Sequence, residues 1–270
     1  MPAWVRVASL GQGAAAALEG GERGEVWAAF RRAAYLRMGG GLVALTPQGS
    51  HAGPIHAVLA DPLPPLEVGT AVRVEADRVL VGESLVIDLS AAEAWSGYHP
   101  TPGALWRGRR LASRSVAAVA ARSALLFPPY RSRCGDWSTA LAEPDIARVA
   151  GLLGGVGPGL TPSGDDALAG VLFVARLLWG ATAEQHLMAC LVEARASEPS
   201  ISFLVWAARG QALAPAHDLL LAAAAGRVDK AARSAARRAS ARCRPGRPGC
   251  SAARPSGRYR RRGCRSREGR

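Results

Sequence analysis

Residues 154–166 read GGVGPGLTPSGDD and separate two apolar stretches that have helical spacing. The segment holds five glycines, two prolines, two hydroxyl side chains and two adjacent carboxylates. Gly154 and Gly155 suit the end of a helix over residues 144–153, because glycine readily adopts the left-handed backbone that closes many helices. An ordinary connection needs no such density of special residues. The composition therefore predicts a helix–loop–helix joint that also carries a site.

The second helix is expected to begin inside this segment. Thr161 or Ser163 can supply its cap, with Pro162 at the first helical position if Thr161 is the cap. Asp165 and Asp166 then fall in the first turn, where the helix dipole stabilises negative charge by roughly 0.3–1 kcal/mol each. The dipole gives no reason, however, for two acids together beside a loop rich in glycine.

We expect the loop to bind a polar ligand. Asp165 and Asp166 are the candidate catalytic residues and, if the site holds a metal such as Mg²⁺, its candidate ligands. The candidate substrate-binding residues are Gly157, Gly159, Thr161, Ser163 and Gly164. A P-loop has the same glycine spacing but carries Lys and Ser or Thr where this chain has the two acids, so a direct phosphate cradle is not predicted. An anion could bind through a bridging divalent cation or on the loop amides. The alternative is a tight joint that binds nothing.

The helix after the loop is apolar nearly all round from Ala167 to Trp179, which predicts the buried centre of a helical part. Ala169 and Gly170 lie one turn beyond the acids, so they leave open space beside the carboxylates or let another backbone pack close. Farther along the chain, Ser200 and Ser202 precede another apolar helix and are interpreted as capping residues.

The order of predicted elements indicates the fold class. Short apolar pieces between Gly and Pro predict strands at residues 41–45, 54–59, 71–74, 79–81 and 84–87. Residues 24–37 are ambiguous, because alanine favours helix whereas alternation of Val26, Ala28 and Phe30 favours strand, and we expect strand. Helical spacing follows at residues 104–127, 144–153, 165–179, 183–196, 200–209 and 215–225.

Strands followed by helices predict an α+β fold. The expected architecture is an N-terminal β-rich sheet or small barrel, then a mainly helical part, then a disordered basic C-terminal tail. The predicted domains are residues 1–97, which are β-rich, and residues 103–230, which are helical and carry the Gly/Asp loop. Residues 231–270 form the tail.

The formal net charge of +13 lies entirely in this tail. Residues 231–270 contain 14 of the 34 basic residues, all of them Arg, and 1 of the 21 acidic residues. They include no Leu, Ile, Val, Phe, Met or Trp, so the tail cannot bury a core. It is either a polybasic arm that neutralises nucleic-acid phosphates or the product of GC-rich DNA translated in the wrong frame. We favour the frameshift, because the composition changes abruptly near Lys230, and we expect a nucleic-acid partner only if the tail is genuine.

Cysteine spacing and the length of apolar runs argue against several classes of protein. Cys134 and Cys190 are isolated, and the tail has no C-x-x-C pair, so neither a disulfide framework nor a zinc site is predicted. The N-terminus lacks a signal-peptide pattern, and the longest apolar run, Ala167 to Ala175, is far too short for a membrane span. We expect a cytoplasmic protein with no membrane partner.

Residues 155–170, GVGPGLTPSGDDALAG, resemble the signature of the bacterial family typified by the AllH subunit of oxamate carbamoyltransferase. Weaker resemblance at residues 42–45, 67–69 and 91–95 extends it over most of residues 1–230. The resemblance implies a subunit that acts with other carbamoyltransferase subunits in purine-derived nitrogen metabolism. Its small-molecule substrates would be carbamoyl phosphate and a small oxo or amide acid such as oxamate.

Carbamoyl transfer needs an anion site for the phosphate and donors for a tetrahedral oxyanion, and a glycine-rich loop that enters a helix offers amides for both. The rival hypothesis is a small-molecule or nucleic-acid binding protein whose loop is structural and whose tail is a polybasic arm. A third hypothesis is that the subunit acts on another small acid.

The chain departs from the family in one respect. Family members continue beyond the helix at residues 215–230 into a second Gly-x-Thr-Ser-Gly-x-Asp segment followed by Leu-x-Gly, where this chain has its Arg-rich tail. If the second loop completes the site, this chain has a truncated C-terminus and its site is incomplete.

Nucleotide sequence tests the origin of the tail directly. Reading the bases after the Lys230 codon in the other two frames should reveal the second Gly-x-Thr-Ser-Gly-x-Asp segment. A genuine arm would instead give DNA affinity that falls steeply with salt and is lost when residues 231–270 are deleted. Such affinity, with no motif in either frame, would contradict the frameshift.

Overall fold

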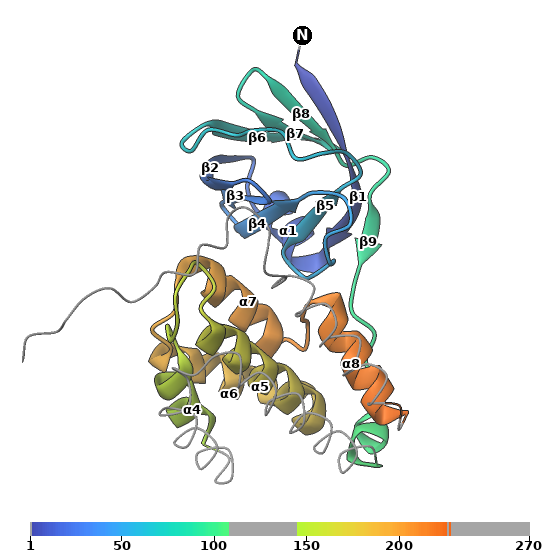
Figure 1. The fold of residues 1–270 in the computed structure, drawn as a ribbon, viewed down its shortest axis with the longest axis vertical. Helices are drawn as coiled ribbons and strands as arrows, with labels where there is room; N and C mark the ends of the chain where they lie inside the picture. The colour runs from blue at the N-terminus through green and yellow to red at the C-terminus, as the bar shows by residue number, and fades with distance from the viewer. Residues whose placement is uncertain (1, 108–144, 226, 228–270) are drawn as a thin grey trace, which may run out of the picture.

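The computed structural model of the chain describes residues 2–107, 145–225 and 227. Within them, a β-barrel formed by the N-terminal strands sits above a helical part (Figure 1). The predicted α+β order, with a small barrel followed by helices, is confirmed. The tail predicted to be disordered and most of the helix predicted at residues 104–127 lie outside the described residues.

Eight strands close the barrel in the order β5-β4-β3-β2-β6-β7-β8-β1, and β1 pairs back onto β5. Their bounds are β1 Ala3–Gly11, β2 Arg23–Phe30, β3 Ala33–Met38, β4 Gly41–Thr46, β5 His56–Leu59, β6 Ala71–Glu75, β7 Arg78–Val81 and β8 Leu85–Asp88. A ninth strand, β9 (Glu93–Trp95), pairs with the last residues of β1, beyond the part of β1 that pairs with β8. Because the interior of the closed barrel is filled by hydrophobic side chains, its contacts with the helical part are made by residues on its outer face.

Strand prediction succeeded where alternation or flanking turns marked the segment. The five predicted strands are present as β4 to β8, and residues 24–37 form the antiparallel pair β2 and β3, as expected. Three elements were not predicted: β1, β9 and the helix α1 (Gln12–Glu19). Helix α1 has 8 residues, too few to be stable alone. It forms because Ala14, Ala17 and Leu18 are buried in the barrel cluster, while Gly13 packs against Trp206 of the helical part.

The helical part comprises α4 (Ile146–Leu153), α5 (Ser163–Trp179), α6 (Glu184–Cys190), α7 (Glu198–Ala208) and α8 (Ala214–Ala224). The predicted helix at 183–196 is wrong in its length, because short 3-10 turns at Ala181–Ala183 and Leu191–Glu193 flank α6. Helix α5 is the centre of this part, as predicted, since its Leu168 and Leu172 are fully buried.

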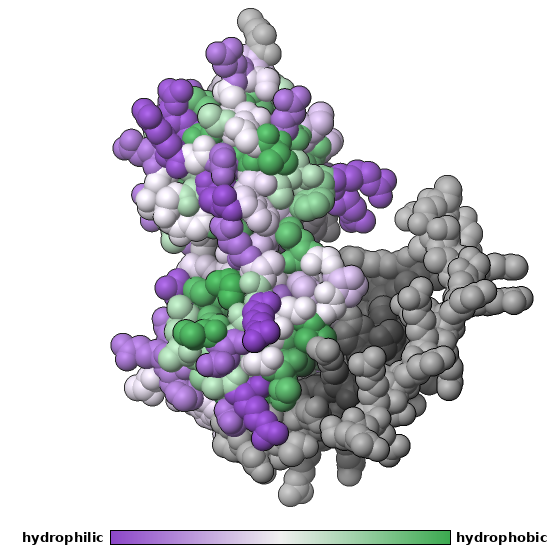
Figure 2. Space-filling view, turned by 90° about the vertical axis from the view of Figure 1, so that its left-hand side faces the viewer, coloured by the Kyte–Doolittle hydropathy of each residue, from purple (hydrophilic) through white to green (hydrophobic). Residues whose placement is uncertain are grey.

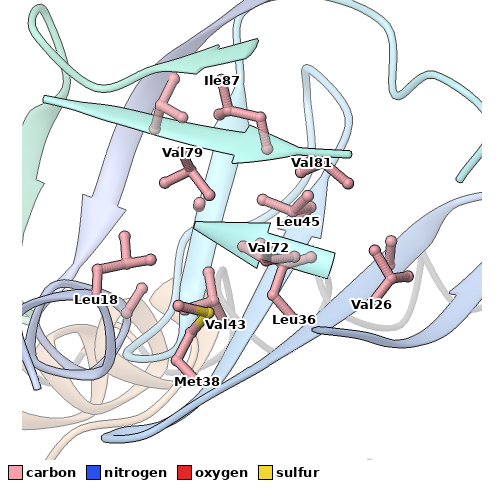
Figure 3. Packing of buried hydrophobic residues seen from close by; sticks show 14 of the residues in the cluster. Leu18, Val26, Leu36, Met38, Val43, Leu45, Val72, Val79, Val81 and Ile87 are labelled. Atoms are coloured by element: carbon pink, nitrogen blue, oxygen red, sulfur yellow. The ribbon is translucent and has the colours of Figure 1, made fainter. Parts of the chain in front are cut away.

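Two separate hydrophobic clusters stabilise the described residues. One fills the barrel with side chains from α1 and the inner faces of the strands, including Val26, Leu36 and Val43 (Figure 3). The other lies among the helices around Leu168, Leu172 and Phe173. The division of the chain into domains at residues 97 and 103 stays a prediction.

A buried histidine joins the segment after β9 to the helical part. His217 accepts the Ala212 amide at Nε2 (3.1 Å), so its Nδ1 carries the proton that it donates to the Tyr98 carbonyl (3.0 Å). Burial lowers the pKa of His217, which favours this neutral form. The Gly97 amide donates to Gln211, and a Cβ at Gly97 would lie 2.0 Å from the His217 ring. The connection is therefore tightly packed.

Alternation along β3 and β4 explains how the barrel meets the helices. In β3, Ala34, Leu36 and Met38 point inward, which leaves Tyr35 and Arg37 on the outer face. In β4, every residue from Leu42 to Thr46 is buried, so both faces of this strand are covered. Helix α7 contacts β4 and lies under the barrel (Figure 1). The helical part thus uses the outer face of β3 to β5 as a platform.

The Leu36→Ala substitution tests the barrel core. Leu36 is fully buried on the inner face of β3, so truncation should lower the free energy of unfolding by about 2–5 kcal/mol through lost burial and a cavity. Val68→Ala, at a side chain that is 65% exposed, should change it by less than about 0.5 kcal/mol. Urea denaturation compares the two, and equal effects would contradict the barrel register.

Candidate functional site

The loop between α4 and α5 has the backbone that its glycines predict. Gly155, Gly157 and Gly159 have positive φ angles of 73°, 124° and 99°. At Gly155 a side chain is also excluded by contact, because a Cβ would lie 2.3 Å from the carbonyl oxygen of Arg195. The segment before α7 therefore packs directly against the start of the loop.

Asp165 is a buried residue that holds the loop onto α5. Its side chain is 2% exposed, and Oδ1 accepts a hydrogen bond from the Gly155 amide at 2.6 Å. Its other oxygen, Oδ2, is also buried and has no hydrogen-bond partner among the described residues. Buried carboxylate oxygens normally accept a hydrogen bond, so Oδ2 is an acceptor whose donor is missing among the described residues.

Asp166 differs from its neighbour because it keeps its solvent exposure. Partial desolvation, followed by the nearby charge of Asp165, raises the pKa of the Asp166 carboxyl. Gly170, one turn along the helix on the same face, has no atom of the described residues within 4 Å of where a Cβ would lie. Of the two predicted outcomes for the small residues of α5, open space is the one found at Gly170.

The helix entry corrects the predicted cap. Pro162 occupies the N-cap and Ser163 is the first helical residue, with no side-chain capping bond, so neither Thr161 nor Ser163 caps α5. The amide of Asp166 donates to the Pro162 carbonyl at 3.1 Å. The dipole of a 17-residue helix still points at the loop.

The predicted substrate-binding residues differ in what their amides do. Gly164 donates to the Val156 carbonyl at 2.8 Å and has no room for a side chain, so its amide is already used within the fold. The amides of Gly157, Gly159 and Thr161 donate to no acceptor in the part of the chain that the structure describes. Gly157 and Gly159 are also exposed, and thus these three amides remain available.

Helix α7 holds the middle of the loop. Ser197, its N-cap, donates from its hydroxyl to the Leu160 carbonyl at 2.5 Å, and the buried Ser200 hydroxyl lies 3.4 Å from the same oxygen. The interpretation of Ser200 and Ser202 as caps is therefore wrong. The helix begins earlier, at Glu198. Ser202 lies one turn inside it and donates its hydroxyl hydrogen to the Glu198 carbonyl.

The barrel supplies residues that were not predicted for this site. Arg37, on the outer face of β3, makes a two-pronged ion pair with Glu198 of α7, with Nε to Oε1 at 2.9 Å. Burial, followed by the charge of Asp166, raises the pKa of the Tyr35 phenol. Strand alternation could have placed Tyr35 and Arg37 on one face, but only the fold brings that face to α5 and α7.

The donor set bears on the metal hypothesis. Among the described residues, no group of three or more His, Cys, Asp or Glu side chains gathers at one place. One oxygen of Asp165 is already used by Gly155, so the protein offers a divalent ion only part of a shell. Mg²⁺ commonly binds through one or two carboxylates with substrate phosphates and water, and the acid pair fits only that mode.

A cavity of about 520 Å³ lies in a different place, between α1, the β6–β7 turn and β9. Leu10, Leu18 and Val74 line it, and no residue of the glycine loop does. It is therefore separate from the candidate site. None of the described helices has the length and apolar character that crossing a bilayer requires.

Stability separates the two acids. Asp165→Ala removes a buried charge-assisted hydrogen bond and should lower the free energy of unfolding by about 1–3 kcal/mol. Asp166→Asn should raise it by less than about 1 kcal/mol at neutral pH, because solvent screens the like charge that it relieves.

The stability that Asp166→Asn gains at neutral pH should disappear at low pH. The folded pKa of Asp166 lies above its ordinary value of 3.8, so ionisation costs stability as pH rises through that window, and below it both forms are neutral. Thermal melts of Asp165→Ala and Asp166→Asn at several pH values measure both changes in stability. If the two variants behaved alike, the assignment of Asp165 as the buried acid and Asp166 as the exposed acid would be contradicted.

Comparison with known proteins relates part of the helical region to a family. Residues 153–241 match the family model described as oxamate carbamoyltransferase subunit AllH. The comparisons with curated proteins and with solved structures gave no match. The match begins at the last residue of α4 and ends within the Arg-rich segment, so the weaker resemblance at 42–45, 67–69 and 91–95 lies outside it and stays a prediction. The predicted resemblance to the AllH family is confirmed over residues 153–241.

Proposed function

We propose that this chain is a subunit of a carbamoyltransferase that acts in the cytoplasm on carbamoyl phosphate and a small oxo or amide acid. The observation that carries the proposal is the match of residues 153–241 to the AllH family, which includes the whole glycine loop and both acids. The loop and the N-terminus of α5 are the ligand site in this proposal. Other subunits complete the enzyme.

The steps of carbamoyl transfer determine which hydrogen-bonding groups the site needs. A nitrogen of the acceptor acid attacks the carbamoyl carbon, the carbonyl oxygen becomes an oxyanion in a tetrahedral intermediate, and the bond to the phosphate oxygen breaks. Phosphate leaves with the electron pair, and the acceptor nitrogen loses a proton. Hydrogen-bond donors are therefore needed for the oxyanion and the phosphate, and acceptors for the carbamoyl NH₂ group.

The described residues offer both kinds of group. The available amides of Gly157, Gly159 and Thr161 can donate to an oxyanion, helped by the dipole of α5. The exposed Asp166 carboxylate can only accept hydrogen bonds while ionised, and the carbamoyl NH₂ group is a donor that suits it.

A phosphate dianion beside two carboxylates needs a compensating positive charge. Arg195, whose backbone contacts Gly155, is exposed and forms no ion pair with any residue that the structure describes. We assign the phosphate to the side of the loop next to Arg195. A Mg²⁺ ion bridging the phosphate to Asp166 is the second way to supply the charge.

Thermal shift of the full chain tests the function. Carbamoyl phosphate at about 100 times its Kd should add about 2.7 kcal/mol of stability, which corresponds to a rise of several degrees in Tm. Phosphate and oxamate are tested separately, each with and without Mg²⁺, to show which part of the substrate binds and whether a cation is required.

Asp166→Asn is the informative variant, because it keeps shape and does not weaken the fold. It should abolish most of the carbamoyl phosphate shift, whereas Asp77→Asn, at an exposed turn of the barrel, should leave the shift unchanged. A folded chain that none of these ligands stabilises would refute the loop as an independent site.

A further inference from the structure

We propose that the barrel forms the second wall of the glycine-loop site and that Tyr35 of β3 binds the acceptor acid there, donating its hydroxyl hydrogen to an oxygen of that acid. This inference rests on the proposed function, because it names the residue that holds the second substrate of the same site. The chemical class of the ligand is a small acid with carboxylate or amide oxygens.

The first step is the direction of the side chain. Residues of β3 alternate between the barrel core and the outside, and Leu36 is fully buried in the core. Tyr35 and Arg37 consequently share the outer face. Arg37 is held by Glu198, the first residue of α7, so this face is fixed against the helical part.

The second step links that face to the loop. Ser197, next to Glu198, donates its hydroxyl hydrogen to the Leu160 carbonyl, and Ser200 one turn later is within reach of the same oxygen. A continuous series of polar contacts therefore runs from Arg37 through the start of α7 to the middle of the glycine loop. The outer face of β3 and the loop are two sides of one region.

The third step concerns the orientation of the ring. Trp27 and Phe30 of β2 meet Tyr35 edge-on, at centroid distances of 6.3 and 6.4 Å and interplanar angles of 88° and 85°. These contacts hold the phenol from the barrel side. Burial and the Asp166 charge raise the pKa of Tyr35, so its hydroxyl keeps the proton that it would donate.

The last step is chemical complementarity. The charged groups near this seam are the carboxylates of Asp165, Asp166, Glu198 and Glu25, together with Arg37, which is paired with both Glu198 and Glu25, and Arg195, which is assigned to the phosphate. A substrate oxygen needs a donor, and the neutral phenol of Tyr35 supplies one without adding charge. The acids then face the NH₂ groups of the substrates and Tyr35 faces an oxygen.

Tyr35→Phe in the full chain removes only the hydroxyl and keeps the ring packing. Calorimetric titration with oxamate in the presence of carbamoyl phosphate should show an affinity about tenfold weaker than that of the unmodified chain. Affinity for carbamoyl phosphate alone should be unchanged. Tyr98→Phe, at a side chain that is 80% exposed, is the matched control and should bind both ligands normally.

The outcomes separate this inference from the proposed function. If the unmodified chain binds both ligands and Tyr35→Phe binds oxamate equally well, the role of Tyr35 is overturned while the proposed function stands. If the unmodified chain binds neither ligand, both fail. A loss of carbamoyl phosphate affinity equal to that for oxamate would also overturn the inference, because it would indicate a general structural effect.

A ligand-free measurement tests the placement of Tyr35 by itself. Unfolding equilibrium constants of Tyr35→Phe, Asp166→Asn and the double variant form a cycle. If Tyr35 faces Asp166 across the site, the two substitutions should be coupled by about twofold or more in that constant. If the effect of the double variant equals the product of the single effects, Tyr35 does not face Asp166 and the inference is overturned.

Discussion

The hydrogen bond from the Gly155 amide to Asp165 Oδ1 is the contact on which the candidate site depends. It joins the start of the glycine loop to the first turn of α5, so a segment with three positive φ angles closes onto a buried carboxylate. Because Asp165 is held this way, its second oxygen is presented without a partner and Asp166 is left at the surface. One acid is therefore structural and oriented, and the other is accessible.

The barrel gives this arrangement a second rigid support. Its interior is filled by its own core, and its outer face at β3 to β5 is covered by the helical part (Figure 1). On the face of the molecule in Figure 2, hydrophilic side chains project from both the barrel and the helical part, with hydrophobic patches between them. The Arg37–Glu198 ion pair and the contact of His56 with Phe203, whose ring centroids are 5.6 Å apart, span the junction. Sites supported by rigid elements on two sides keep their geometry better than sites on a loop alone.

Much of the fold could be predicted from local pattern. The strands β4 to β8 and the helices α4 and α5 follow from apolar periodicity and from Gly and Pro between them. The unpredicted α1 has alanines that favour helix but is too short to show a period, and the three-residue β9 is shorter still. The general preference of N-caps for hydroxyl residues favours Thr161 or Ser163 at the start of α5, whereas the hydrogen bond from Gly164 to Val156 sets the entry and places Pro162 at the N-cap.

The sequence by itself determined the order of strands and helices, the position of the glycine loop and the presence of two acids at a helix start, because these depend on neighbours along the chain. It did not determine which acid would be buried, since Asp165 and Asp166 are chemically identical and differ only in which side of α5 they occupy. Nor could it bring Arg37 to Glu198 at the start of α7, which lies 161 positions later in the sequence. Those juxtapositions come from the closure of the barrel and the packing of α7 against it, and long-range packing of this kind is decided only in the tertiary structure.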